Sequence, residues 1–184
     1  MKLIVAVTGA SGIIYAKHFM KALKDQGVET HLIVTDSAKS VAAHEIEDIN
    51  QITSLATHLY SSDDMSAGIA SGSYPVDGMV IVPSSMKTIA ALANGFADNL
   101  VTRAADVQLK ERRPLIVVPR ETPLHAIHLE NMAKLSRLGA TILPAMPGFY
   151  HKPETIDDLV DFIVGRILDH LGIQNHLFTR WGSA

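Results

Sequence analysis

Charged side chains flank an apolar run at residues 115–118. Arg103 and Lys110 precede the run, and Arg120 with Glu121 follows it almost directly. Such a run is typical of a parallel strand buried on both faces, and open parallel sheets bind ligands beyond the carboxyl ends of their strands. Cationic groups at that position favour an anionic ligand, and a phosphate is the first candidate.

Two further loops follow apolar runs and carry small or hydroxyl side chains. Residues 8–12 are Thr-Gly-Ala-Ser-Gly, and residues 83–88 are Pro-Ser-Ser-Met-Lys-Thr. Small residues let the backbone approach a ligand, and the N–H groups of a following helix can bind a phosphate. Each loop alone could equally be a tight turn or a serine N-cap. On neighbouring strands, the two together favour a nucleotide-like binding site.

The first loop differs from a dinucleotide-binding sequence. Such a sequence places a third small residue near position 15 for close helix–strand packing, whereas this chain has Tyr15. Asp36 could still bind a ribose at the end of the second strand. A small NAD-dependent oxidoreductase therefore stays an alternative, but the chain lacks a recognisable Tyr-x-x-x-Lys pair.

The proline-rich loop at residues 144–153 also follows a strand, and it presents the hydroxyl of Tyr150 from a stiff backbone. Among nine histidines, His125 and His128 stand three apart on one expected helix. No carboxylate or cysteine accompanies them at a recognisable ligand spacing. We therefore predict no metal site.

Apolar runs and amphipathic segments alternate along the chain, which predicts a doubly wound, mainly parallel α/β sheet. The expected strands are residues 3–7, 30–35, 78–82, 115–118 and 140–143. The expected helices are residues 13–25, 38–45, 48–56, 64–70, 87–94, 98–111, 123–138 and 155–172. Thr122 followed by Pro123 predicts an N-cap and first turn. We find no linker or repeat, so residues 1–184 are expected to form one domain.

Composition narrows the class of protein. With 184 residues, 47% hydrophobic and 19% charged, the chain is predicted to be globular. A net charge of −3 argues against a dedicated nucleic-acid binder. The lack of cysteine excludes disulfides, thiolate metal sites and a cysteine nucleophile, and it is consistent with a cytoplasmic protein. No apolar stretch approaches the ~20 residues of a membrane span.

Several motifs together resemble the UbiX-type flavin prenyltransferases, including their Pad1-like members. They occur in order and cover the chain nearly end to end: residues 8–12, 71–73, 83–88, 97–100, 103–106, 109–113, 120–124 and 147–150. The resemblance implies a Rossmann-like flavoprotein fold and a homo-oligomer, usually a dodecamer of trimers, with FMN at subunit interfaces.

The resemblance also implies a reaction. The family joins a dimethylallyl group from dimethylallyl phosphate to N5 and then C6 of reduced FMN, without a metal. The product, prenylated FMN, is the cofactor of UbiD-type decarboxylases. Whether the donor is the monophosphate or the pyrophosphate stays open, as does the decarboxylase that receives the product.

Residue by residue, the resemblance assigns three sets of positions. FMN binding is assigned to Gly9, Ala10, Ser11, Ser37, Ser85, Met86, Lys87, Thr88 and Arg120. The allyl phosphate and its prenyl chain are assigned to Arg103, Lys110, Tyr150, Arg166, Trp181 and Tyr74. The expected catalytic residues are Glu121, Lys110 and Ser11.

These assignments agree with the chemistry of an allylic phosphate. Lys110, Tyr150 and Arg166 could stabilise the departing negative charge without a metal. Glu121 could protonate the phosphate or later remove the C6 proton, if its surroundings raise its pKa. The aromatic ring of Trp181 or Tyr74 could stabilise an allylic cation. Tyr150 and Arg166 lie far enough along the chain to come from a neighbouring subunit.

Two rivals belong to other classes of protein. Flavin-dependent cysteine decarboxylases share the expected architecture, but they typically carry an active-site histidine and a Pro-Ala-Ser-Ala-Asn-Thr-like motif. Residues 83–88 differ from that motif. A non-catalytic flavin carrier that serves a decarboxylase is the other rival, and only an assay separates it from an enzyme.

Overall fold

The computed structural model describes residues 1–182, and its centre is a six-stranded sheet. The strands are β1 (Lys2–Val7), β2 (Glu29–Val34), β3 (His58–Ser61), β4 (Gly78–Ser84), β5 (Leu115–Pro119) and β6 (Thr141–Ile142). All neighbouring strands run parallel, in the order β3-β2-β1-β4-β5-β6. The chain first builds outward from β1 to β3 and then returns to β4 on the other side of β1. This reversal creates the crevice where such sheets bind ligands.

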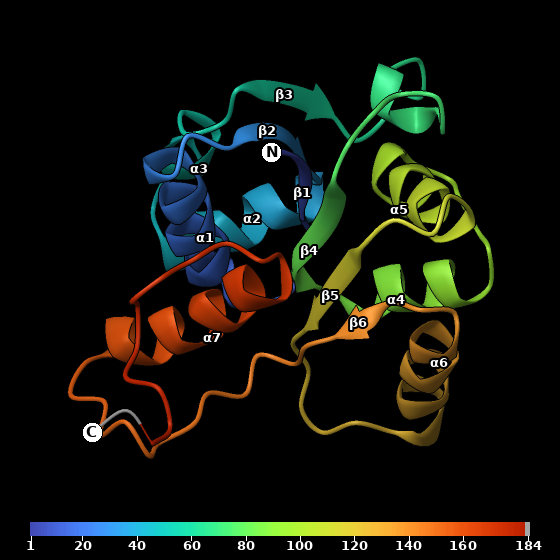
Figure 1. Ribbon diagram of the computed structural model, residues 1–184. Coiled ribbons are helices and arrows are strands. Elements are labelled where there is room, and N and C mark those ends of the chain that lie inside the picture. The colour runs from blue at the N-terminus through green and yellow to red at the C-terminus, as the bar shows by residue number, and fades with distance from the viewer. Residues whose placement is uncertain (183–184) are drawn as a thin grey trace.

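Helices cover both faces of the sheet (Figure 1). One face is covered by α1 (Ile13–Asp25), α2 (Asp36–Glu45), α3 (Asn50–Thr53) and α7 (Ile156–His170). The other is covered by the 3-10 turn η1 (Gly68–Ala70) with α4 (Met86–Ala93), α5 (Leu100–Lys110) and α6 (Ala126–Arg137). Alternate β1 residues enter opposite cores, Leu3 and Val5 on the α1 side and Ile4 on the α4 side, because strand side chains alternate between faces. The predicted doubly wound fold is confirmed.

Polar caps start several helices at the carboxyl edge of the sheet. The hydroxyl of Thr35 accepts a hydrogen bond from Ala38 N at the start of α2, and that of Ser85 accepts from Thr88 N at the start of α4. A side-chain oxygen in this position satisfies one of the free N–H groups of the first turn. The same caps therefore hold hydroxyl groups at the crevice.

Three helix predictions need correction. The helix expected at residues 64–70 is only the short turn η1, and the one expected at 48–56 shortens to α3. Thr122 does not cap α6: His125 is the N-cap, and its extended backbone (φ −103°, ψ 171°) delays the helix until Ala126. The Thr122–Pro123 peptide is cis.

The strand β3 was not predicted. Three of its four residues are exposed, because it lies at the edge of the sheet, and its sequence lacks the apolar run that marks the buried strands. Across residues 1–182, no helix is long and apolar enough to cross a membrane.

Candidate functional site

The ends of β1 and β4 are tied together by Thr8. Its side-chain hydroxyl donates to the Pro83 carbonyl at 2.9 Å and accepts from the Ser85 N–H at 2.9 Å. Thr8 is almost completely buried, at 1% exposure, so these bonds fix its rotamer. The two loops that the sequence placed at one edge are thus joined by a single side chain.

Two glycines let the first loop pass close to its neighbours. A Cβ on Gly9 would stand 2.5 Å from both Cβ and Oγ of Ser37, a separation that real side chains do not reach. Gly12 has φ +105°, which favours glycine, and a Cβ there would meet the Tyr15 ring at 2.9 Å. Tyr15 can replace the small residue of dinucleotide-binding proteins because it packs against Gly12, at the start of the helix.

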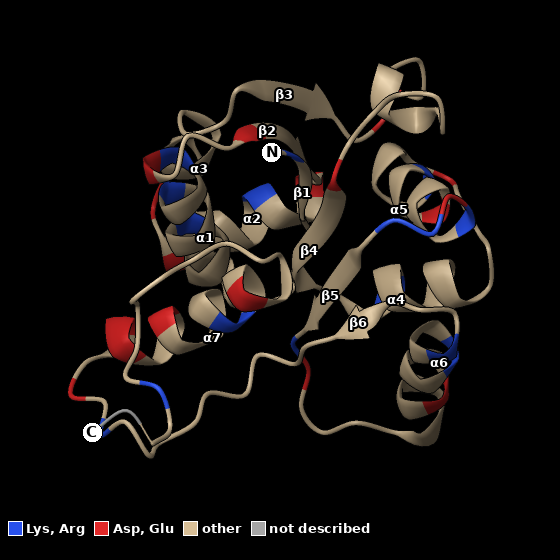
Figure 2. Ribbon diagram, viewed as in Figure 1, with Lys and Arg blue, Asp and Glu red and all other residues tan. Residues whose placement is uncertain are grey.

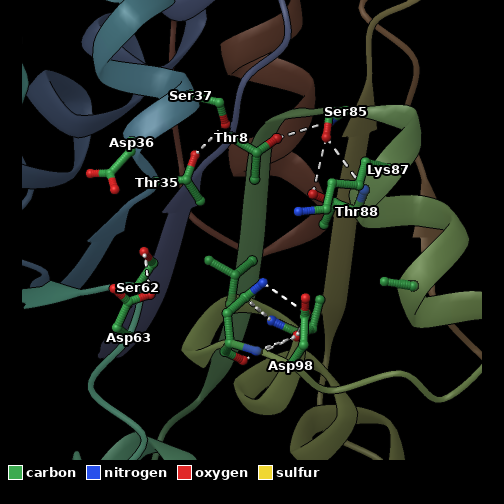
Figure 3. Close-up of a pocket in the computed structure, with 14 residues that line it drawn as sticks. Thr8, Thr35, Asp36, Ser37, Ser62, Asp63, Ser85, Lys87, Thr88 and Asp98 are labelled. Atoms are coloured by element: carbon green, nitrogen blue, oxygen red, sulfur yellow. Dashed lines mark hydrogen bonds between the residues drawn. The ribbon is translucent and has the colours of Figure 1, made fainter.

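A polar pocket of about 370 Å³ opens at this edge on the α4 side (Figure 3). Thr35 and Ser37 pair their hydroxyls at 3.1 Å, as do Ser85 and Thr88. Lys87 adds the cationic side chain that lines this pocket. Figure 3 shows these hydroxyls together, with Asp36 beside Thr35 and with Asp63 and Asp98 on the opposite side. Hydroxyls at the starts of α2 and α4 suit a phosphate and a polyol chain.

A second pocket, of about 480 Å³, lies on the α1 side of the same loop. Its lining is mostly apolar, with three polar exceptions, and consists of Ser11, Gly12, Ile14, Tyr15, Glu45, Arg120, Ala145, Pro147, Ile156, Leu159 and Val160. Burial raises the pKa of Tyr15, although the charge of Arg120 opposes the rise. An apolar slot with a guanidinium suits a flat, partly polar ring system.

The carboxylate of Glu45 lies at the start of α1, and the sequence analysis did not identify this residue. Its carboxylate accepts hydrogen bonds from Gly12 N at 2.9 Å and Ile13 N at 2.7 Å. A carboxylate is favoured there because the free N–H groups carry partial positive charge. Glu45 is the last residue of α2, where a glutamate usually faces solvent, so no local pattern identified it.

The charged segment around β5 divides between the two edges of the sheet (Figure 2). Near the start of α5, Arg103 donates to the Ala70 carbonyl at 3.0 Å and pairs with Asp106 at 3.1 Å. Lys110 ends α5 and pairs with the neighbouring Glu111. Within one chain, the charged groups before and after β5 therefore do not form one cluster, because the length of the strand separates them.

Arg120 and Glu121 leave β5 at the carboxyl edge. The Arg120 N–H donates to the Ser84 carbonyl at 3.3 Å, which continues the pairing of β4 and β5. Glu121 accepts from the Thr122 N–H at 2.9 Å. Both side chains are exposed, and Arg120 lines the second pocket. Arg120 and Glu121 lie at this edge because β5 ends at Pro119, and not because a helix begins at Thr122.

Tyr150 and Trp181 lie together, with ring centroids 5.1 Å apart. Trp181 is 81% exposed and Tyr150 41%. Asp169 anchors the segment before Trp181, since Arg180 forms a forked pair with its carboxylate at 2.9 and 2.7 Å. This hydrogen bonding lowers the pKa of Asp169. Arg166 also approaches Asp169, at 3.5 Å.

The predicted positions thus fall into three places. The flavin set lies at the carboxyl edge, where Ser37, Ser85, Lys87 and Thr88 line the polar pocket and Ser11 and Arg120 the apolar one. Met86 instead packs against the apolar core. Arg103, Lys110 and Tyr74 lie toward the α5 side, where the Tyr74 carbonyl is held by Arg113. Tyr150 and Trp181 form the third group. Arg166 belongs to none of the three and lies on α7.

Comparisons with known proteins match the chain over its length. The Flavoprotein family matches residues 1–168. The flavin prenyltransferase UbiX of Methanocaldococcus jannaschii is 52% identical over 184 residues, with all of both chains covered.

Solved structures agree. A dodecameric FMN-dependent UbiX-like decarboxylase from Escherichia coli O157:H7 superposes with a TM-score of 0.97 at 46% identity, over 100% of both chains. AnUbiX (PadA1), solved with FMN and dimethylallyl pyrophosphate, has a TM-score of 0.97 at 43% identity, over 100% of this chain and 98% of its own. A peptidyl-cysteine decarboxylase, at 19% identity and a TM-score of 0.65, shares the fold alone.

Proposed function

Because the chain belongs to the UbiX-type flavin prenyltransferases of the flavoprotein family, we propose that its two edge pockets together hold FMN. The reaction is the transfer of a dimethylallyl group to N5 and C6 of reduced FMN, which gives prenylated FMN. The observation that supports the placement is that the loop of residues 8–12 borders both pockets: Thr8 lines the polar pocket, and Ser11 and Gly12 line the apolar one. Residues 1–184 then act as one flavin-binding domain.

The two pockets differ in the part of FMN that they suit. The hydroxyls of Ser37, Ser85 and Thr88, with the ammonium of Lys87, would bind the phosphate and ribityl chain. The apolar pocket would take the isoalloxazine ring, with Arg120 beside its polar edge. Reduced flavin supplies the nucleophilic N5 and C6. Gly9 and Ala10 contribute backbone that can approach the ligand closely.

Lys87 and Arg120 at this edge are assigned to FMN, so the allyl phosphate needs further cationic groups. Lys110 and Arg103 lie on α5, away from Glu121. We propose that a second copy presents them over the flavin of the first. A related structure described as dodecameric supports this arrangement. The predicted dodecamer and the role of Tyr150 and Arg166 as further phosphate ligands rest on the same argument.

At the site formed by two copies, the reaction would need stabilisation of the departing phosphate and a group that transfers protons. Lys110, Arg166 and the Tyr150 hydroxyl would stabilise the phosphate as its C–O bond breaks. Glu121 would then protonate the phosphate or remove the C6 proton. Glu45 would hold the loop that carries Ser11, because it accepts from the two N–H groups directly after that residue. Trp181 and Tyr74 would shield the allylic chain.

We further propose that the product passes to a UbiD-type decarboxylase, and that the reaction occurs in the cytoplasm. The second proposal follows from the need for reduced flavin, since the cytoplasm is the reducing compartment. The donor would be dimethylallyl phosphate. The pyrophosphate in a relative's structure makes it the first alternative to test.

An assay of flavin mass tests the function. The purified protein is incubated anaerobically with reduced FMN and either dimethylallyl phosphate or the pyrophosphate, and the flavin is examined by mass spectrometry. A flavin that gains one five-carbon unit is the expected result. Unchanged flavin that stays bound would indicate a carrier. Release of CO₂ from an added aromatic acid or a peptidyl cysteine would indicate a decarboxylase.

A further inference from the structure

Three potential metal ligands lie close together where β3, the outermost strand of the sheet, pairs with β2. Glu29 and His31 are on β2, and His58 on β3 pairs in register with His31. None of the three lines either flavin pocket. Among residues 1–182, this is the one group of at least three histidine or acidic side chains whose ligand atoms lie close enough together for a metal, all within 4.8 Å.

The spacing of the ligand atoms suits a tetrahedral ion. Glu29 Oε1 lies 3.2 Å from His31 Nε2 and 3.5 Å from His58 Nε2. Around Zn²⁺, with bonds of about 2.0–2.1 Å, neighbouring ligand atoms stand roughly 3.4 Å apart. The two imidazole rings stack at 4.6 Å, and both direct Nε2 toward the same carboxylate. The ligand atoms of the three residues all lie within 4.8 Å of one another. Because His58 is exposed on the edge strand, its ring can move the short distance toward the other two ligands that metal binding requires.

His31 has the surroundings of an oriented metal ligand. It is completely buried, and its other nitrogen, Nδ1, lies 2.9 Å from the Tyr60 hydroxyl. Such an outer partner fixes the ring and its tautomer, and leaves Nε2 to bind a metal.

A positive charge already sits beside this group. Lys2 Nζ lies 3.1 Å from Glu29 Oε1 and 5.2 Å from the centre of the Tyr74 ring. The ammonium satisfies the carboxylate electrostatically in the absence of an ion. Because the Lys2 side chain is 29% exposed, it can turn toward solvent when a divalent cation replaces it. Lys2 therefore competes with the metal ion for the carboxylate of Glu29.

We propose that Glu29, His31 and His58 form a site for a divalent transition metal of the Zn²⁺ type, with a fourth position left for water. Its ligands come from two neighbouring strands, which indicates a structural role: the ion would fasten the short edge strand β3 to β2. A four-residue strand at the edge of a sheet gains little stability from pairing with one neighbour. A metal ion that joins β3 to β2 would therefore stabilise the position of β3.

Cobalt(II) is the probe, because tetrahedral Co²⁺ absorbs visible light and Zn²⁺ displaces it. The full chain, with any affinity tag removed, should bind about one Co²⁺ per chain and lose the absorption when Zn²⁺ is added. His58→Phe keeps the ring stack but removes the nitrogen, and should weaken binding at least tenfold. His176→Ala, which removes an exposed histidine elsewhere, is the matched control and should bind normally.

Three further measurements test the site without a change to the buried His31. Lys2→Met should tighten Co²⁺ binding, because it removes the competing ammonium. Tyr60→Phe should weaken binding about 10- to 100-fold through loss of the outer partner. Zn²⁺ at a hundredfold excess over Kd should raise Tm by roughly 5 to 10 °C in wild type. A visible band that is absent from wild type, or that His58→Phe retains, would overturn the site.

Discussion

Replacing Gly9 by alanine should damage FMN binding through one defined contact. The added Cβ would lie 2.5 Å from Cβ and Oγ of Ser37. Carbon atoms in contact stand about 3.5–4.0 Å apart, so the loop must retreat by about 1 Å. Overpacking of this kind costs about 1–3 kcal/mol. If that cost falls on the flavin-binding conformation, the Kd for FMN rises by a factor of roughly 5 to 150.

A double-mutant cycle identifies the contact. Ser37→Gly removes both clashing atoms but also a predicted ligand hydroxyl, and should weaken FMN binding about fivefold. The Gly9→Ala/Ser37→Gly double variant should then bind about as well as Ser37→Gly alone, somewhat reduced by the Ser37 carbonyl carbon that would remain 3.2 Å away. Non-additive effects of this kind mark residues in direct contact.

Quenching of FMN fluorescence gives each Kd, and a thermal melt reports the fold. Gly27→Ala is the control for a glycine replacement without a clash: a Cβ there would meet no atom within 4 Å, although Gly27, unlike Gly9, has positive φ (+66°). This variant should lose some stability and keep its affinity for FMN. Unchanged affinity in Gly9→Ala, or losses that multiply in the double variant, would refute the placement of flavin beside this loop.

Three further predictions concern the chemistry and the C-terminal segment. Glu121→Gln should bind FMN normally but stall turnover or accumulate a partly alkylated flavin, and normal product formation in a single-turnover assay would remove Glu121 from the mechanism. Arg166→Ala should raise the KM for the allyl phosphate with little change in FMN affinity; loss of FMN binding instead would show that Arg166 serves the flavin. Asp169→Asn should remove the forked pair with Arg180 and lower the fluorescence anisotropy of Trp181, the one tryptophan, at pH 7. In wild type, Arg180 lowers the pKa of Asp169, so this anchorage should persist at neutral pH and be lost only as the pH falls below about 4; equal anisotropy in the two proteins at pH 7 would contradict it.

The sequence predicted which loops lie at the carboxyl edge of the sheet, because their positions depend on local patterns. Residues 8–12 and 83–88 follow buried apolar runs, and parallel strands end at one edge of a sheet. The hydroxyls of Thr35 and Ser85 begin helices as N-caps, which short-range preferences also predict. The doubly wound fold could therefore be predicted without knowledge of long-range contacts.

The parts that could not be predicted depend on contacts between distant segments. Glu45 reaches the start of α1 only because α2 packs beside it. His58 belongs to an exposed edge strand that carries no apolar run. Lys110 and Glu121 are close in sequence but are separated by β5, since a strand of five residues spans about 17 Å.

Complementation between two inactive variants tests most directly whether the reaction site is built from two copies. Lys110→Ala and Glu121→Gln are each expected to be nearly inactive as homo-oligomers. Co-expressed with different tags and purified as mixed oligomers, they should regain about a quarter of the wild-type rate of flavin prenylation, because random mixing then pairs a native Lys110 with a native Glu121 at about one site in four. Mixed oligomers no more active than either parent would mean that both groups serve the same chain's site, and would contradict the account.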